Sequence, residues 1–136
     1  MKIKYDITVM GYMSLFENVT KAKLRDCIAD NTITFVVEPG EIGRAIGKKG
    51  MNVYMLEKIF KKKIRIVEFS ENLQTFIKNL VAPLKLAGIE ENGDVVFLEA
   101  IDLKSRGILI GRNAQNLRQF EAIVKRYYPI KELRVK

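Results

Sequence analysis

The stretch of this sequence best suited to bind a ligand is Ile46-Gly47-Lys48-Lys49-Gly50, in which two glycines flank two lysines. Glycine has no Cβ, so such a loop can turn sharply and let a ligand approach its backbone. A helix expected from Met51 would direct its first free N–H groups, and the positive end of its dipole, toward the two lysines. This combination favours phosphate binding, and no histidine lies near it to indicate catalysis.

An internal repeat argues against the alternative, which is an ordinary solvated turn between two helices. The segment Gly43–Gly47 aligns without a gap with Gly107–Gly111, 64 residues later, and a cation follows in both copies. The same offset aligns Asn52 with Asn116 and continues along the following segment. Two copies indicate tandem domains, because a solenoid needs at least three repeats to cover its core.

The composition restricts the function classes. A net charge of +8 over 136 residues indicates an anionic partner, with nucleic acid favoured over an acidic membrane. The chain has no histidine, and Cys27 is its one cysteine, so histidine-based catalysis, an intrachain disulfide and a site of several thiolates are excluded. We therefore expect no catalytic residues, no metal, no cofactor and no small-molecule substrate.

No segment looks like a targeting or membrane-spanning sequence. The first residues alternate without an apolar core like that of a signal peptide, and no apolar run approaches the ~20 residues that a membrane span needs. We therefore expect a cytoplasmic protein with no membrane partner.

The hydrophobic pattern predicts the elements of the first half. Lys2 to Val9 alternates like a half-buried strand, and Ser14 with Glu17 could form the capping box of a short helix. Two strands, two helices and a last strand are then expected at Leu24–Ala29, Thr32–Val37, Glu41–Ile46, Met51–Lys61 and Ile64–Phe69. The methionines are expected to fill the core.

The second half predicts the same order. Ser70 would cap a helix from Glu71 to about Val81, and Asn92-Gly93 is a strong hairpin signal. Asp102 would cap a short helix ending at Ile110-Gly111. The remaining predicted elements are strands at Leu84–Glu90, Asp94–Ala100 and Ile130–Val135, and a helix at Ala114–Tyr127.

The predicted fold class is α+β, with two domains that each contain a small three-stranded sheet covered by helices. We place the first domain, with its N-terminal strand and helix, at residues 1–69 and the second at residues 70–136. No Gly/Ser-rich linker separates them, so we expect them to pack at a fixed angle.

The motif Ile46-Gly47-Lys48-Lys49-Gly50-Met51-Asn52-Val53 resembles the I-G-x-x-G-x-x-hydrophobic signature of the K-homology (KH) domain. The element order of each half resembles the type II form of that fold. Two such domains joined through Leu80-Val81-Ala82-Pro83 resemble the RNA-binding part of the NusA family, in its short archaeal form. The resemblance covers nearly the whole chain.

The resemblance implies a binding site for about four nucleotides of single-stranded RNA or DNA. Gly47 and Gly50 would admit the phosphates, with Lys48 and Lys49 facing them. The wall of the base-binding groove would include Ile42, Ile46 and Val53, with the strand Ile64 to Val67 as its base-reading edge. Arg44 is either a further RNA contact or a solvated surface arginine.

The second copy departs from the family motif. Its loop is Gly111-Arg112-Asn113-Ala114, with alanine in place of the second glycine. An alanine held at positive φ would be strained, whereas one that simply starts the helix would not. We predict that Gly111, Arg112 and Asn113 also bind RNA, the alternative being a copy that only orients the first domain.

Three functional settings follow. The resemblance implies an RNA-binding protein of transcription elongation or termination that acts near RNA polymerase. The alternative is a ribosome-associated or ribosome-assembly KH protein. A nuclease is disfavoured, because its metal ions need clustered acids and the sixteen acids here are scattered.

Overall fold

The computed structural model describes residues 5–136, and the chain divides into two compact units, Met1–Phe69 and Ser70–Lys136. Both units have the same order of elements, helix-strand-strand-helix-turn-helix-strand. In the first unit these are α1 (Ile7–Thr20), β1 (Leu24–Ala29), β2 (Thr32–Val37), α2 (Ile42–Ile46), the 3₁₀ turn η1 (Lys48–Gly50), α3 (Met51–Phe60) and β3 (Lys63–Glu68).

The second unit repeats this series. Its elements are α4 (Leu73–Val81), β4 (Leu86–Asn92), β5 (Val95–Ala100), α5 (Leu103–Ile110), the 3₁₀ turn η2 (Arg112–Ala114), α6 (Gln115–Lys125) and β6 (Glu132–Val135). Each glycine loop therefore connects the two helices that follow a hairpin, as the repeat predicted.

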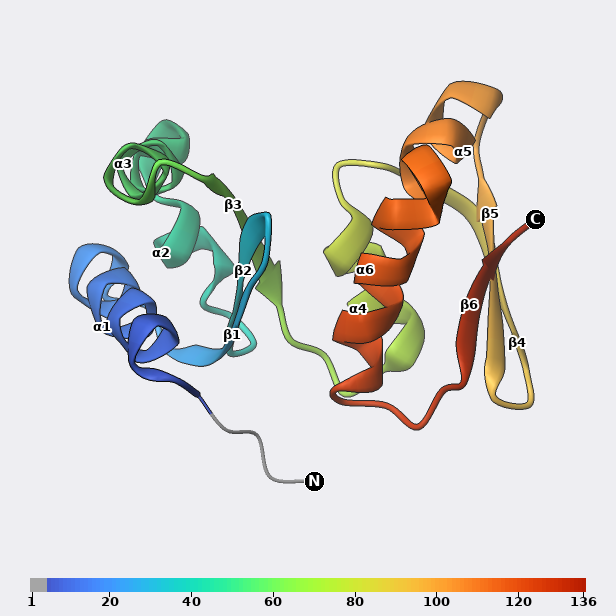
Figure 1. The fold of residues 1–136 in the computed structure, drawn as a ribbon, viewed down its shortest axis with the longest axis horizontal. Helices are drawn as coiled ribbons and strands as arrows, with labels where there is room; N and C mark the ends of the chain where they lie inside the picture. The colour runs from blue at the N-terminus through green and yellow to red at the C-terminus, as the bar shows by residue number, and fades with distance from the viewer. Residues whose placement is uncertain (1–4) are drawn as a thin grey trace. The chain divides into compact units, whose positions relative to one another are not determined.

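Each unit has a three-stranded sheet with helices on one of its faces, so both are α+β (Figure 1). The sheet orders are β1-β2-β3 and β4-β5-β6. In the first sheet, β2 pairs antiparallel with β1 and parallel with β3, so Phe35 lies between Cys27 and Ile66. The second sheet pairs in the same way, with β5 at its centre. Strands β3 and β6 are thus sheet edges.

The core of the first unit lies between its sheet and its helices. Phe16 of α1 stacks on Phe35 of β2 with ring centroids 4.3 Å apart, and both side chains are fully buried. Leu56 of α3 and Ala45 of α2 are buried in the same cluster. Helices α2 and α3 thus each contribute one buried side chain to this core, and Ile42 and Phe60 pack against it partly buried.

The N-terminal strand predicted over residues 2–9 is wrong from Ile7 onward, where the chain is helical, and residues 2–4 lie outside the described part. Asp6, not Ser14, caps this helix, because its side chain accepts a hydrogen bond from the Val9 N–H at 2.8 Å. Val9, Tyr12, Met13, Phe16 and Val19 recur at helical spacing and face the core. This longer stripe outweighs the short alternation that precedes it.

Two other expectations need correction. Helix α4 is capped by Asn72, whose side chain accepts from the Thr75 N–H at 2.9 Å, so Ser70 is not its cap. The methionines do not all fill the core, because Met10, Met51 and Met55 are exposed. The hairpin of the second unit forms as predicted around Gly93, and Asp102 caps α5.

Candidate nucleic-acid interface

The backbone conformation of the first loop is one that only certain residue types adopt readily. Gly47, directly after α2, has φ 79° and ψ 170°, a conformation that essentially only glycine adopts. Lys49 and Gly50 follow with φ values of 54° and 71°, both left-handed, and α3 begins at Met51. The chain therefore reverses within one turn between the end of one helix and the start of the next.

Close packing restricts Gly47 further. A Cβ there would lie 2.8 Å from the side-chain Cγ of Asn52 and 3.2 Å from its backbone nitrogen. A Cβ on Gly50 would meet nothing within 4 Å, so at that position only the backbone conformation favours glycine. The two glycines of the motif thus have different physical roles.

Asn52 connects the two helices across the loop. Its side-chain Nδ2 donates a hydrogen bond to the Arg44 carbonyl oxygen at 3.0 Å. This bond joins the first turn of α3 to the end of α2, where carbonyl groups lack partners within the helix. It also places the amide against Gly47, so the loop is held before any ligand arrives.

The second loop has nearly the same backbone. Gly111 has φ 75° and ψ 175°, and its Cβ would lie 2.7 Å from the Cγ of Asn116. Asn116 Nδ2 donates to the Ile108 carbonyl oxygen at 2.8 Å, as Asn52 does in the first unit. Asn113, like Lys49, is left-handed, at φ 54°.

Ala114 takes the strained of the two conformations considered for it. Its φ of 59° and ψ of 22° are close to the 71° and 18° of Gly50. An L-residue other than glycine rarely adopts this conformation, because its Cβ approaches the following carbonyl. The alanine therefore leaves the shape of the loop unchanged at some cost in free energy.

Helix α5 is well anchored before this loop. The Ser105 N–H donates a hydrogen bond to Asp102 Oδ1 at 2.7 Å. Hydrogen bonds from the backbone and the side chain of Ser105 hold the pKa of the Asp102 carboxyl below its usual range. A charged carboxylate at this position also complements the helix dipole.

The cations of both loops are exposed. Lys48 and Lys49 lie on the surface of the first loop, and Arg112 and Asn113 on that of the second. The Arg44 guanidinium, with 62% of its side chain exposed, lies 3.9 Å from Glu41. So loose a surface pair leaves Arg44 free to reorient toward an anion.

The structure also brings the predicted groove residues near one another. Helix α2 packs on β3, and Ile42 of α2 and Ile64 and Ile66 of β3 are partly buried against the same core. Ile46, at the end of α2, remains 37% exposed, and Val53 of α3 is half-buried. All five of these apolar side chains are therefore partly exposed, on helices α2 and α3 and on the edge strand β3.

Sequence reasoning did not assign a role to Asn52 or Asn116. The signal was present, because the two asparagines align in the internal repeat five residues after the first glycine of each loop. What the sequence could not show is the reach of each amide back to a carbonyl of the preceding helix.

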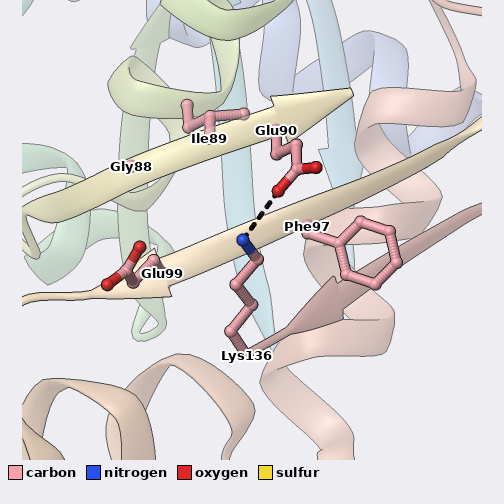
Figure 2. Close-up of a pocket in the computed structure, with 6 residues that line it drawn as sticks. All are labelled: Gly88, Ile89, Glu90, Phe97, Glu99 and Lys136. Atoms are coloured by element: carbon pink, nitrogen blue, oxygen red, sulfur yellow. Dashed lines mark hydrogen bonds and ion pairs between the residues drawn. The ribbon is translucent and has the colours of Figure 1, made fainter. Parts of the chain in front are cut away.

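A pocket in the second unit is not part of either loop. Figure 2 shows its lining residues, which are Gly88, Ile89, Glu90, Phe97, Glu99 and Lys136. Lys136 Nζ donates to Glu90 Oε2 at 2.7 Å, which raises the pKa of Lys136 and lowers that of Glu90. The pocket thus contains an ion pair and none of the predicted site residues.

Comparison with known proteins adds independent evidence. The KH domain family model matches residues 11–106, which include the first loop and end before the second. The probable transcription termination protein NusA of Methanocaldococcus jannaschii is 34% identical over 138 residues, covering 98% of this chain and 75% of that protein. Its namesake in Methanococcus vannielii is 36% identical over 139 residues, covering 99% and 80%. The chain belongs to the archaeal NusA-like family of KH-domain proteins.

A solved structure has a similar fold over nearly the whole chain. The crystal structure of APE1850 matches with a TM-score of 0.75 and 25% identity, over 97% of this chain and 100% of that one. Within residues 5–136 of this NusA-like chain, no three His, Cys, Asp or Glu side chains gather where they could hold a metal ion. None of the helices described there is long and apolar enough to cross a membrane.

Proposed function

We propose that this chain binds single-stranded RNA by clamping its phosphate backbone at the Gly47–Gly50 loop. The observation that carries the proposal is a loop whose backbone is fixed by Gly47 and Asn52 and which presents two exposed lysines at the start of α3. A preorganised site loses less conformational entropy on binding. Bases would then lie along Ile42, Ile46 and Val53 toward β3, with Arg44 as a further contact.

We further propose that each unit is one type II KH domain, at residues 1–69 and 70–136, and that the second also binds RNA. The near-identical backbone of Gly111, Arg112, Asn113 and Ala114 supports this proposal. With one cation instead of two lysines, the second loop would contribute less to affinity.

The setting we propose is transcription elongation or termination, in the cytoplasm and near RNA polymerase, without catalysis. The relatives' shared name, probable transcription termination protein NusA, supports this setting over a ribosomal one. No observation on this chain favours the ribosome-associated alternative.

Fluorescence anisotropy with short labelled RNA strands at several salt concentrations tests the clamp. Lys48→Asp/Lys49→Asp should weaken binding by at least tenfold, and Arg112→Asp by less. The affinity of the wild type should fall with salt by about 0.7 log unit per log unit of salt for each neutralised phosphate.

A charge-matched control separates the loop from net charge. Lys104→Asp/Lys131→Asp removes two exposed lysines outside both loops and likewise lowers the net charge from +8 to +4. Equal losses in the two double variants would show a diffuse charge effect and contradict the clamp. So would folded Lys48→Asp/Lys49→Asp protein that binds like wild type.

A further inference from the structure

Helix α3 carries an exposed apolar stripe, made of Met51, Tyr54, Met55 and Ile59. These side chains are 56%, 57%, 41% and 47% exposed, whereas Leu56 on the same helix is fully buried. Spacings of three and four residues place the stripe on one face of the helix. Four large apolar side chains that gather on one face typically mark an interaction surface.

The fold itself does not require this stripe. Helix α6 has the same place in the second unit, and the residues that align with the first three members are Gln115, Arg118 and Gln119. The residue that aligns with Ile59 is Ile123, which is buried there. The same architecture is thus built with polar residues at three of the four positions, so the fold does not require Met51, Tyr54 and Met55 to be apolar.

The surroundings of the stripe on α3 are basic. Lys58 Nζ lies 5.1 Å from the centroid of the Tyr54 ring, and the exposed Lys61 and Lys62 directly follow the helix. The one acid of α3, Glu57, is directed elsewhere, because its Oε2 accepts a hydrogen bond from the Ile64 N–H of β3 at 3.2 Å. A partner that covers the stripe would therefore meet apolar side chains and a positive rim.

We propose that the α3 stripe docks an acidic amphipathic helix of a partner protein. Apolar side chains of such a helix, spaced as i, i+3, i+4 and i+7, would pack on the stripe, while its carboxylates would face Lys58, Lys61 and Lys62. Flexible methionines suit such a contact, because they adapt to the shape of a partner. RNA fits the stripe less well, since bases stack on aromatic faces and Tyr54 is the only one among the four residues.

The test replaces the stripe with the residues that α6 has at the same positions. The variant Met51→Gln/Tyr54→Arg/Met55→Gln should fold, because none of these side chains is buried. The probe is a fluorescein-labelled synthetic helical peptide with leucines at i, i+3, i+4 and i+7 and glutamates elsewhere. Wild-type protein should bind it saturably, and the variant at least tenfold more weakly. The variant gains a positive charge, so a loss cannot come from weaker general electrostatics.

Three controls sharpen the result. A peptide with lysines in place of the glutamates should bind the wild type at least tenfold more weakly. Gln115→Ser/Gln119→Ser in α6 should leave peptide binding unchanged, and the stripe variant should keep its RNA affinity within twofold. Tyr54→Arg alone, checked by circular dichroism like the triple variant, serves if the triple variant does not fold.

Three outcomes would overturn the proposal. The first is no saturable binding of the acidic peptide to the wild-type chain. The second is a folded stripe variant that binds the peptide like wild type. The third is a tenfold loss of RNA affinity in that variant, which would assign the stripe to RNA instead.

Discussion

The two glycine loops of this chain have nearly the same backbone but present different chemistry. Gly47 and Gly111 differ by only a few degrees, at φ 79° and 75°. The exposed positions between the glycine and the helix carry two lysines in the first loop and an arginine and an asparagine in the second. The two loops thus share a backbone shape but differ in the charge that they present.

This difference separates the residues that build the loop from those that face a ligand. In each copy a glycine in a glycine-only conformation lies against an asparagine that joins the two helices. Those two residues are the same in both loops, and the residues on the outer surface vary. We call Gly47 with Asn52, and Gly111 with Asn116, the frame of each loop. Measurements of stability therefore test the frame, and measurements of RNA affinity test the outer surface.

The largest expected effect is on the frame. Gly47→Ala should destabilise the first unit by about 2–4 kcal/mol, because it adds backbone strain to a 2.8 Å contact with Asn52. Gly111→Ala should do the same in the second unit. Native-state hydrogen exchange, which reports each unit separately, measures both effects.

Gly43→Ala is the matched control for Gly47→Ala. Gly43 lies in α2, and a Cβ there would meet nothing within 4 Å. This change should stabilise the helix by about 0.5–1 kcal/mol. If Gly47→Ala were equally harmless, the conformation described for the loop would be wrong.

The position of the second glycine is Gly50 in the first loop and Ala114 in the second. Exchanging glycine and alanine there should lower stability in the first unit and raise it in the second. Gly50→Ala introduces the strain that Ala114 already carries, and should cost about 1 kcal/mol. Ala114→Gly removes that strain and should stabilise the second unit by a similar amount. Denaturation of the two single variants checks this, and a destabilising Ala114→Gly would contradict the strain.

The elements around the loops were predictable because each has a strong local signal. The hairpin at Gly93, the N-cap at Asp102 and the glycines of both loops are examples in which one residue type fixes one backbone conformation. The start of the N-terminal helix was predicted too late, at Ser14 instead of Ile7, because four alternating residues suggested a strand, while the core selected the helical stripe from Val9 to Val19. The exposure of Met51 and Met55 was missed because an apolar residue signals burial whether it faces the core or a partner.

The asparagine bond is the next smaller test of the frame. Asn52→Ala removes the Nδ2 donor to the Arg44 carbonyl and should cost about 0.5–1 kcal/mol, with a loss of RNA affinity because the loop becomes less ordered. Asn52→Asp, which has the same shape but no amide donor, should cost more than the alanine variant in both stability and RNA affinity, because its carboxylate would face the Arg44 carbonyl oxygen and repel phosphate. Asn116→Ala should reproduce the loss of stability in the second unit, with a smaller change in RNA binding.

The smallest expected effect concerns the outer surface of the loops. Exchanging the residue at position 49 or 113 for its counterpart in the other loop should make the RNA affinities of the two loops more alike. Lys49 and Asn113 share a φ of 54°, and asparagine tolerates this conformation better than lysine, so Lys49→Asn should not destabilise the first unit. It should weaken RNA binding by about fivefold, as expected for about 1 kcal/mol from one exposed charge. The slope of log affinity against log salt concentration should also become shallower by about 0.7. Asn113→Lys should raise the RNA affinity and make its salt dependence steeper. If Lys49→Asn leaves the salt dependence unchanged, Lys49 does not neutralise a phosphate, and Lys48 alone would distinguish the first loop from the second.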